Sequence, residues 1–130
     1  MFNGKINKGF EEVCRVYIAS PYTKGDQALN VRLQMDVGHK LLDLGCAPFV
    51  PLLYHFMHIS FPHHYNEWLD LDLIWLKQSH CLIRFPGESS GADYEVSRAI
   101  KWDIPVFFAI NENIPEDFLR FLKEKFNYVI

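Results

Sequence analysis

The sequence predicts an α/β fold, a flavodoxin- or Rossmann-like three-layer sandwich around a mostly parallel sheet of four or five strands. Two observations indicate this class. Short apolar segments rich in strand-forming residues alternate with amphipathic segments, and 49% of the 130 residues are hydrophobic, enough to form a core. Strands that alternate with helices are joined by right-handed crossovers, which leaves the strands parallel and both faces of the sheet covered. The length suits one domain, residues 1–130, of which 1–12 are expected to form a loose leader.

Each element follows from its local pattern. Strands are expected at residues 15–20, 47–50, 80–85 and 104–110, where β-branched and other apolar residues cluster. Helices are expected at 27–44, 66–78, 92–102 and 115–126, where apolar residues recur at helical spacing. The helix at 66–78 is apolar nearly all round and should be largely buried. The strand at 104–110 has the unbroken apolar character of one that is covered on both faces. Residues 52–64, which are interrupted by Pro62, should form a loop with room for one helical turn.

Charge and cysteine usage exclude several classes of protein. Thirteen basic and sixteen acidic residues give a net charge of -3, so no broad basic field exists to bind a nucleic-acid polymer. The three cysteines do not form a Cys-x-x-Cys motif, and an odd number cannot pair fully, which favours a reducing cytoplasm. The first twelve residues lack the apolar core of a signal peptide. No apolar stretch approaches the ~20 residues of a membrane span.

Ligands of open parallel sheets bind beyond the carboxyl ends of the strands. The loop that follows the third predicted strand reads PGESSG and leads into a helix. Small residues at Ser89, Ser90 and Gly91 let backbone N–H groups approach an oxygen-rich ligand at the start of that helix. The alternative is an ordinary turn capped by a serine. The loop lacks the Gly-Lys-Ser/Thr end of a Walker motif.

Two pairs of carboxylates are candidates for chemistry. Asp93 and Glu95 stand at the start of the helix at 92–102, where acidic residues usually complement the helix dipole. A carboxylate at this place can also attack carbon or relay a proton. Asp70 and Asp72 lie on the apolar helix at 66–78, and one of the two is expected to face water. Trp68 lies four residues before Asp72 and shares its face of the helix.

The segment before this helix is rich in histidine. Four histidines lie within ten residues of one another: His55, His58, His63 and His64. Metal ligation would need a converging carboxylate or thiol, which the sequence does not offer nearby, so no metal is expected and a lid over the pocket is preferred. Arg84, at the end of the third strand, is expected to pair with Glu88 rather than to bind an anion.

Three segments together resemble a known family. They read VYIASPYT, DLIWLKQSHCLIRFPG and SGADYEVSRAIKWDIPVF, and their order and spacing over residues 15–110 are similar to those of the nucleoside 2-deoxyribosyltransferase superfamily. That superfamily includes the transferases, deoxynucleoside-monophosphate N-glycosidases and many uncharacterised small relatives. The most specific part of the resemblance is the spacing of Gly91, Glu95 and Ala99.

The resemblance implies roles for individual residues. The nucleophilic glutamate falls on Glu95, an aspartate near the base falls on Asp72, and a tyrosine whose hydroxyl lies beside the nucleophile falls on Tyr17. Ser89 matches a serine that contacts phosphate in the monophosphate-cleaving members. Those members also carry Ser-x-Arg-Gly-Gly after the first strand, whereas this chain has PYTKG there, so the need for a 5′-phosphate stays open. The remaining residues expected to contact substrate are Ser90, Gly91, Ser20, Tyr22, Trp68 and Asp93.

The expected activity is therefore cleavage or transfer at the N-glycosidic bond of a (deoxy)nucleoside or nucleoside monophosphate, through a covalent glycosyl-glutamate. No cofactor is needed, and the resemblance implies a homo-oligomer. Transfer and hydrolysis differ only in whether a second base or water accepts the sugar, and both stay open, as do the preferred base and the need for a 2′-deoxy sugar. The alternative is a non-catalytic nucleotide-binding or sensor module on the same fold.

Overall fold

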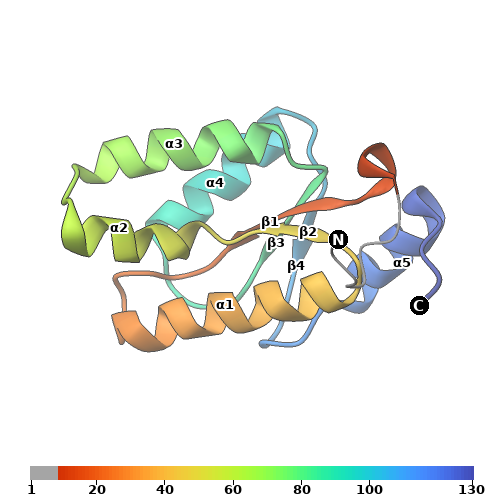
Figure 1. Ribbon diagram of the computed structural model, residues 1–130, viewed down its shortest axis with the longest axis horizontal. Coiled ribbons are helices and arrows are strands. Elements are labelled where there is room, and N and C mark those ends of the chain that lie inside the picture. The colour runs from red at the N-terminus through yellow and green to blue at the C-terminus, as the bar shows by residue number, and fades with distance from the viewer. Residues whose placement is uncertain (1–8) are drawn as a thin grey trace.

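A computed structural model describes residues 9–130 (Figure 1). The strands are β1 (Arg15–Ala19), β2 (Ala47–Phe49), β3 (Cys81–Arg84) and β4 (Val106–Phe108). The helices are α1 (Gln27–Asp43), α2 (Tyr54–Ser60), α3 (Tyr65–Lys77), α4 (Ser90–Lys101) and α5 (Glu116–Phe126). Short 3₁₀ turns occupy Phe10–Glu12 and Pro51–Leu53. Most of the predicted loose leader lies outside the described residues, and its end at Phe10–Glu12 is one of these turns rather than loose chain.

The four strands form one parallel sheet in the order β2-β1-β3-β4. Helices α1 and α5 cover one face, and α3 and α4 cover the other (Figure 1). The predicted three-layer α/β class with a parallel sheet is thereby confirmed, with four strands. From β1 the chain adds β2 on one side and then crosses over to add β3 on the other. The carboxyl ends of β1 and β3 therefore form a topological switch point, which is where such sheets bind ligands.

The alternation of side chains along β1 divides the core into two halves. Val16 and Ile18 face α1 and α5, and they pack in a cluster with Leu41 and Phe118. Tyr17 points to the opposite face, because successive side chains of a strand alternate. There it packs in a second cluster that includes the following residues of β1, β3, α3 and α4: Ala19, Leu82, Leu76, Ala92 and Ala99. The polar end of Tyr17 is thus aimed at the layer formed by α3 and α4.

Residues 52–64 differ from the expected loop. Pro51 begins a 3₁₀ turn, and α2 continues directly from that turn for seven residues. Proline suits the first position of a helical segment, because its missing N–H would have no partner there in any case. Pro62 lies two residues beyond the end of α2, so it separates α2 from α3 instead of interrupting a helix. His55 and His58 therefore project from α2, whereas His63 and His64 lie in the connection between α2 and α3.

The expectation that the helix at 66–78 is largely buried is wrong. Only Leu76 of α3 is fully buried, whereas Ile74 is 61% exposed and Trp75 is 45% exposed. The cause is that α3 lies in an outer layer, where a single face meets the sheet and α4. Trp75 stacks on Phe49 of β2 with 5.8 Å between ring centroids and stays partly exposed, whereas Ile74 is mostly exposed.

The fourth strand also differs from the prediction. It spans three residues at the edge of the sheet, where it pairs only with β3. Phe108 is 61% exposed and Ile110 is 92% exposed, so the apolar run does not indicate a strand covered on both faces.

Within residues 9–130, every helix is too short or too polar to cross a lipid bilayer.

Candidate active site

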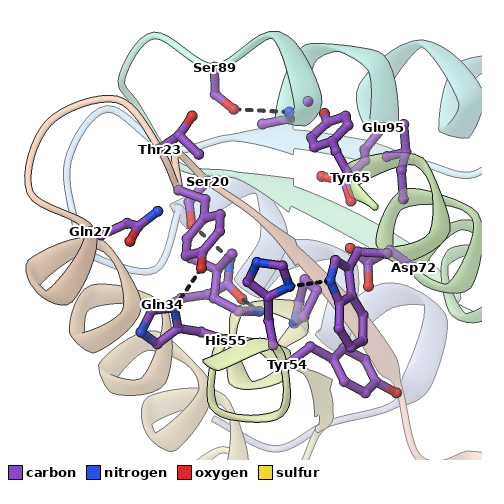
Figure 2. A pocket seen from close by; sticks show the side chains of 18 of the residues that line it. Ser20, Thr23, Gln27, Gln34, Tyr54, His55, Tyr65, Asp72, Ser89 and Glu95 are labelled. Atoms are coloured by element: carbon purple, nitrogen blue, oxygen red, sulfur yellow. Dashed lines mark hydrogen bonds between the residues drawn. The ribbon is translucent and has the colours of Figure 1, made fainter. Parts of the chain in front are cut away.

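A cavity of about 690 Å³ opens at the carboxyl ends of β1 and β3. Its walls come from the loop after β1, from α2 and α3, and from the first turns of α4 (Figure 2). This volume is in the range typical of small-molecule sites, roughly 300–1,000 Å³. The cavity lies at the switch point that the strand order defines, and it contains most of the polar residues that the sequence singled out.

Glu95 is held in this cavity by a buried tyrosine. Its side chain projects from α4 and is 7% exposed, and the hydroxyl of Tyr17 on β1 donates a hydrogen bond to its carboxylate. Tyr17 is itself fixed by stacking on Phe49, with 5.6 Å between ring centroids. Burial raises the pKa of Glu95 to about 7, although the bond from Tyr17 and the charge of Arg84 act in the opposite direction. The carboxyl therefore changes its charge near neutral pH.

Asp72 is the second carboxyl of the site. Burial, and then the charge of Glu95, raise its pKa to about 8. Its Oδ1 atom is buried and has no hydrogen-bond partner among residues 9–130. Asp70, two residues earlier on α3, is exposed. Asp72 is thus mainly protonated at neutral pH, with a polar atom left for a ligand to satisfy.

The loop after β1 is tied to two helices. Gln34 of α1 donates a 2.8 Å hydrogen bond to the hydroxyl oxygen of Ser20, and its carbonyl oxygen accepts one of 2.8 Å from the backbone N–H of Leu52. The hydroxyl of Tyr22 lies 2.5 Å from Nδ1 of His55 on α2. These bonds fix Ser20 and Tyr22, which both line the cavity, in place before any ligand binds.

The first turn of α4 forms the wall opposite α2. Ser89 caps the helix, because its hydroxyl oxygen accepts a 3.1 Å hydrogen bond from the backbone N–H of Ala92. Ser90 and Gly91 line the cavity beside it. The sequence left two interpretations of this loop, an ordinary turn capped by a serine and a loop that binds an oxygen-rich ligand. In the structure Ser89 caps the helix, and the same turn lines the cavity.

Asp93 is placed outside the cavity, where it pairs with Arg84. The guanidinium of Arg84 lies 2.9 Å from the Asp93 carboxylate and donates to the backbone oxygen of Gly87 at 2.9 Å. The expected pair between Arg84 and Glu88 is wrong. Glu88 lies instead 3.6 Å from the ammonium group of Lys24, across the mouth of the cavity. The reason is that Arg84 turns inward to satisfy loop carbonyls, while Glu88 points into solvent.

Gly87 brings two loops of the site into contact. Its φ of 122° lies in the region that favours glycine, and a Cβ atom there would lie 2.6 Å from Cγ of Pro21. The loop after β3 is therefore packed against the loop after β1 at this point, and no larger residue fits between them.

Trp68 lines the cavity but is already engaged with its neighbours. Its indole N–H donates a 2.7 Å hydrogen bond to Nδ1 of His58, and its ring stacks on Tyr54 with 5.5 Å between centroids. His63 packs edge-on against the same ring. Trp68 thereby joins α3 to α2.

Among residues 9–130 no three His, Cys, Asp or Glu side chains converge as a metal site would require.

Among the cavity residues that sequence reasoning missed are Gln34 and Tyr65. The sequence pattern could have indicated Gln34, because it lies between Val31 and Val37 on the buried face of α1. Burying a polar side chain there costs free energy unless it has a hydrogen-bond partner. Tyr65 stands at the first position of α3 and lines the cavity. The sequence pattern indicated only that Tyr65 lies near the start of a helix.

Comparison with known proteins places this fold in a family. The profile of a family described as "Domain of unknown function (DUF7768)" matches residues 14–109, and the chain belongs to that family. No curated protein matches the chain. Among solved structures, the chain is similar to a 2-deoxyribosyltransferase from Bacillus psychrosaccharolyticus, with 21% identity and a TM-score of 0.53. The similarity covers 82% of this chain and 80% of that one, and it shows a shared fold.

The burial of Asp72 should make stability depend on pH. Its pKa is raised from 3.8 to about 8 in the folded chain, so the folded state binds this proton more tightly than the unfolded state does. The contribution of Asp72 to stability is therefore complete at low pH and is lost as the pH rises to about 8. We expect Asp72→Asn to raise the melting temperature by several degrees at pH 9 and to change it little at pH 4.

Thermal unfolding followed by circular dichroism at both pH values measures this difference. Asp70→Asn, on the exposed side of the same helix, is the matched control and should show no such dependence. An Asp72→Asn variant whose melting temperature shifts equally at pH 4 and pH 9 would contradict the assignment of a buried, protonated Asp72.

Proposed function

We propose that this protein cleaves the N-glycosidic bond of a (deoxy)nucleoside or nucleoside monophosphate, with Glu95 as the nucleophile. The observation that carries the proposal is the pair of buried carboxyls, Glu95 and Asp72, in one cavity, with Glu95 oriented by the hydroxyl of Tyr17. The shared fold with a structure described as a 2-deoxyribosyltransferase supports it.

In the first step, a carboxylate oxygen of Glu95 attacks the anomeric carbon of the sugar. The bond between that carbon and the base nitrogen breaks, and its electron pair leaves with the base. Asp72 donates its proton to the departing base, which neutralises the negative charge that develops there. The products of this step are a neutral base, an ionised Asp72 and a glycosyl ester on Glu95.

In the second step, an acceptor attacks the same carbon and releases the Glu95 carboxylate. When the acceptor is another base, a nitrogen atom forms the new bond and its proton passes to Asp72. When the acceptor is water, its oxygen forms the bond, one of its protons passes to Asp72, and free sugar results. Two displacements at one carbon give overall retention of configuration. The same residues serve transfer and hydrolysis, and the scheme requires no cofactor or metal.

The other residues of the cavity have supporting roles in this scheme. Tyr17 is fully buried behind Glu95, so it acts as a positioning residue. Ser20 and Tyr22 form the wall on the β1 side, and Trp68 forms the wall on the α3 side, next to the base that Asp72 protonates. The start of α4, with Ser89, Ser90 and Gly91, faces the sugar or its 5′ substituent.

Glu95→Gln tests the proposal. The amide cannot form a stable ester with the sugar, so turnover should fall by at least ~10³-fold, while ligand binding should persist because shape and hydrogen-bonding capacity are kept. The measurement is release of free base from a panel of deoxynucleosides and their 5′-monophosphates. Each substrate is tested with and without added free base, because base exchange indicates transfer and base release alone indicates hydrolysis.

Glu124→Gln is the matched control, since this exposed glutamate lies on α5, on the opposite face of the sheet. Tyr17→Phe should lower kcat roughly tenfold or more, the cost of losing a hydrogen bond to a charged group. A wild-type protein that binds members of the panel without turning any of them over would overturn the enzyme and favour the sensor module.

The pH profile of kcat/KM should be a narrow bell. Glu95 must lose its proton to act as nucleophile, so activity rises as the pH passes about 7. Asp72 must keep its proton to act as acid, so activity falls above about 8. Initial rates between pH 5 and pH 10 measure both limbs. The residual activity of Asp72→Asn should lack the alkaline limb, and an alkaline limb that survives this change would assign the acid to another group.

We also propose that the protein is a homo-oligomer. Helix α3 exposes Ile74 at 61%, and α2 exposes Phe56 and Ile59 at 54% and 62%. Large exposed apolar side chains are typical of a contact between proteins. Light scattering after size-exclusion chromatography should give a mass above the 15.3 kDa of one chain, and Ile74→Glu should lower it. A wild-type mass of one chain at micromolar concentration contradicts the proposal.

The cysteines support placement in a reducing compartment, the cytoplasm. All three are free and buried. The thiols of Cys14 and Cys81 form a hydrogen bond, with 4.0 Å between the sulfur atoms, and no disulfide joins them. Burial is the first cause of a raised pKa of about 12 for Cys46. Thiols of this kind are inert packing groups.

A further inference from the structure

Tyr65 reaches from the first position of α3 over the first turn of α4. A Cβ atom added to Gly91 would lie 2.7 Å from the hydroxyl oxygen of Tyr65 and 3.9 Å from its Cζ atom. Ser89 is close by, with its hydroxyl oxygen 4.0 Å from the same point. Figure 2 shows the ring of Tyr65 in the cavity between Ser89 and Glu95. A residue larger than glycine at position 91 would therefore displace the hydroxyl of Tyr65, whose side chain is 57% exposed, from this position.

The hydroxyl of Tyr65 is a donor without a protein partner. It makes no hydrogen bond to any of residues 9–130, although its neighbours include two carboxyls. Burial raises the pKa of Tyr65, and the charges of Glu95 and Asp72 raise it further. The phenol therefore stays protonated throughout the working range of pH, so it donates to whatever oxygen the cavity contains.

The position of this donor relative to Glu95 defines what it can contact. Gly91 and Glu95 are four residues apart on α4, so they lie on one face of the helix, about 6 Å apart along its axis. If the anomeric carbon lies at Glu95, then an atom beside Gly91 belongs to the far side of the same sugar ring. The polar atoms there are the 3′ and 5′ oxygens, which are hydroxyl groups in a nucleoside.

We propose that Tyr65 is a specificity-determining residue, which donates a hydrogen bond to a sugar oxygen remote from the anomeric carbon, and that Gly91 is glycine in order to admit it. This inference rests on the function proposed above. It places the sugar in the part of the cavity next to the start of α3. Asp72, seven residues further along the same helix, contacts the base.

The test compares three ligands: a 2′-deoxynucleoside, its 3′-deoxy analogue and its 5′-deoxy analogue. The 5′-monophosphates of the first two are included. For the wild type, kcat/KM should fall roughly tenfold for the analogue that lacks the contacted oxygen. For Tyr65→Phe, kcat/KM for the parent should fall by a similar factor, mainly through KM, and the preference over that analogue should disappear. Tyr94→Phe on the outer side of α4 is the matched control and should keep the preference.

Gly91→Ala is a second test, which probes the close contact between position 91 and Tyr65. In the chain with Tyr65 it should remove the same preference, because the new methyl group displaces the end of the phenol. In the Tyr65→Phe background it should change kcat/KM little, since the atom at 2.7 Å is absent and the nearest ring atom is at 3.9 Å. Additive effects of the two substitutions on kcat/KM would overturn the steric pairing.

The outcomes separate this inference from the function on which it rests. Turnover by a wild type whose preference survives Tyr65→Phe overturns the role of Tyr65 alone. Binding without turnover overturns the enzyme, and the same three ligands then test Tyr65 through dissociation constants measured by calorimetry. A wild type that neither binds nor turns over any of these ligands overturns both.

Discussion

The proposed chemistry depends on two carboxyl groups that are buried together at the carboxyl edge of a parallel sheet. Glu95 and Asp72 lie in a partly desolvated cavity, where two negative charges repel each other more strongly than in water. With pKa values of about 7 for Glu95 and about 8 for Asp72, the two groups hold one proton between them at a pH between these values. The hydroxyl of Tyr17 breaks the symmetry, because it donates to Glu95 and favours the ionised form of that residue, while Asp72 keeps an unpaired oxygen.

The fold accounts for why these three residues meet. Strand alternation sends Tyr17 to the face covered by α3 and α4, and the strand order places β1 beside β3, from which α4 follows. The sequence patterns were sufficient for the α/β class and its parallel sheet, because alternating strands and helices of the right lengths allow few arrangements, but they did not predict the strand order. They failed where burial depends on neighbours that a local pattern does not contain. The apolar residues of α3 and β4 were expected to be covered, but one lies in an outer layer and the other at an edge.

The candidate site likewise has a part that could be predicted from the sequence and a part that could not. Glu95, Asp72 and Tyr17 could be named from the sequence because a family resemblance fixed their spacing. Their contact with one another, and the effect of burial on their acidity, depend on packing between segments up to 78 residues apart. Gln34 and Tyr65 were missed for this reason: each acts through a partner in a different segment, Ser20 for the first and Gly91 for the second. Arg84 was matched to the wrong acid because Asp93 comes within reach only after α4 has turned back over β3.

The packing of Gly87 against Pro21 constrains how sites on this scaffold can diversify. It joins the loops after β1 and β3 on one side of the cavity, at a glycine whose backbone conformation other residues rarely adopt. That side of the opening is therefore of fixed width. Larger or smaller ligands have to be accommodated by the opposite side, where α2 and the start of α3 meet through stacked rings and single hydrogen bonds that different side chains can replace. Among related chains, variation in length and composition is accordingly expected to concentrate in residues 51–65, while the glycine loop keeps its form.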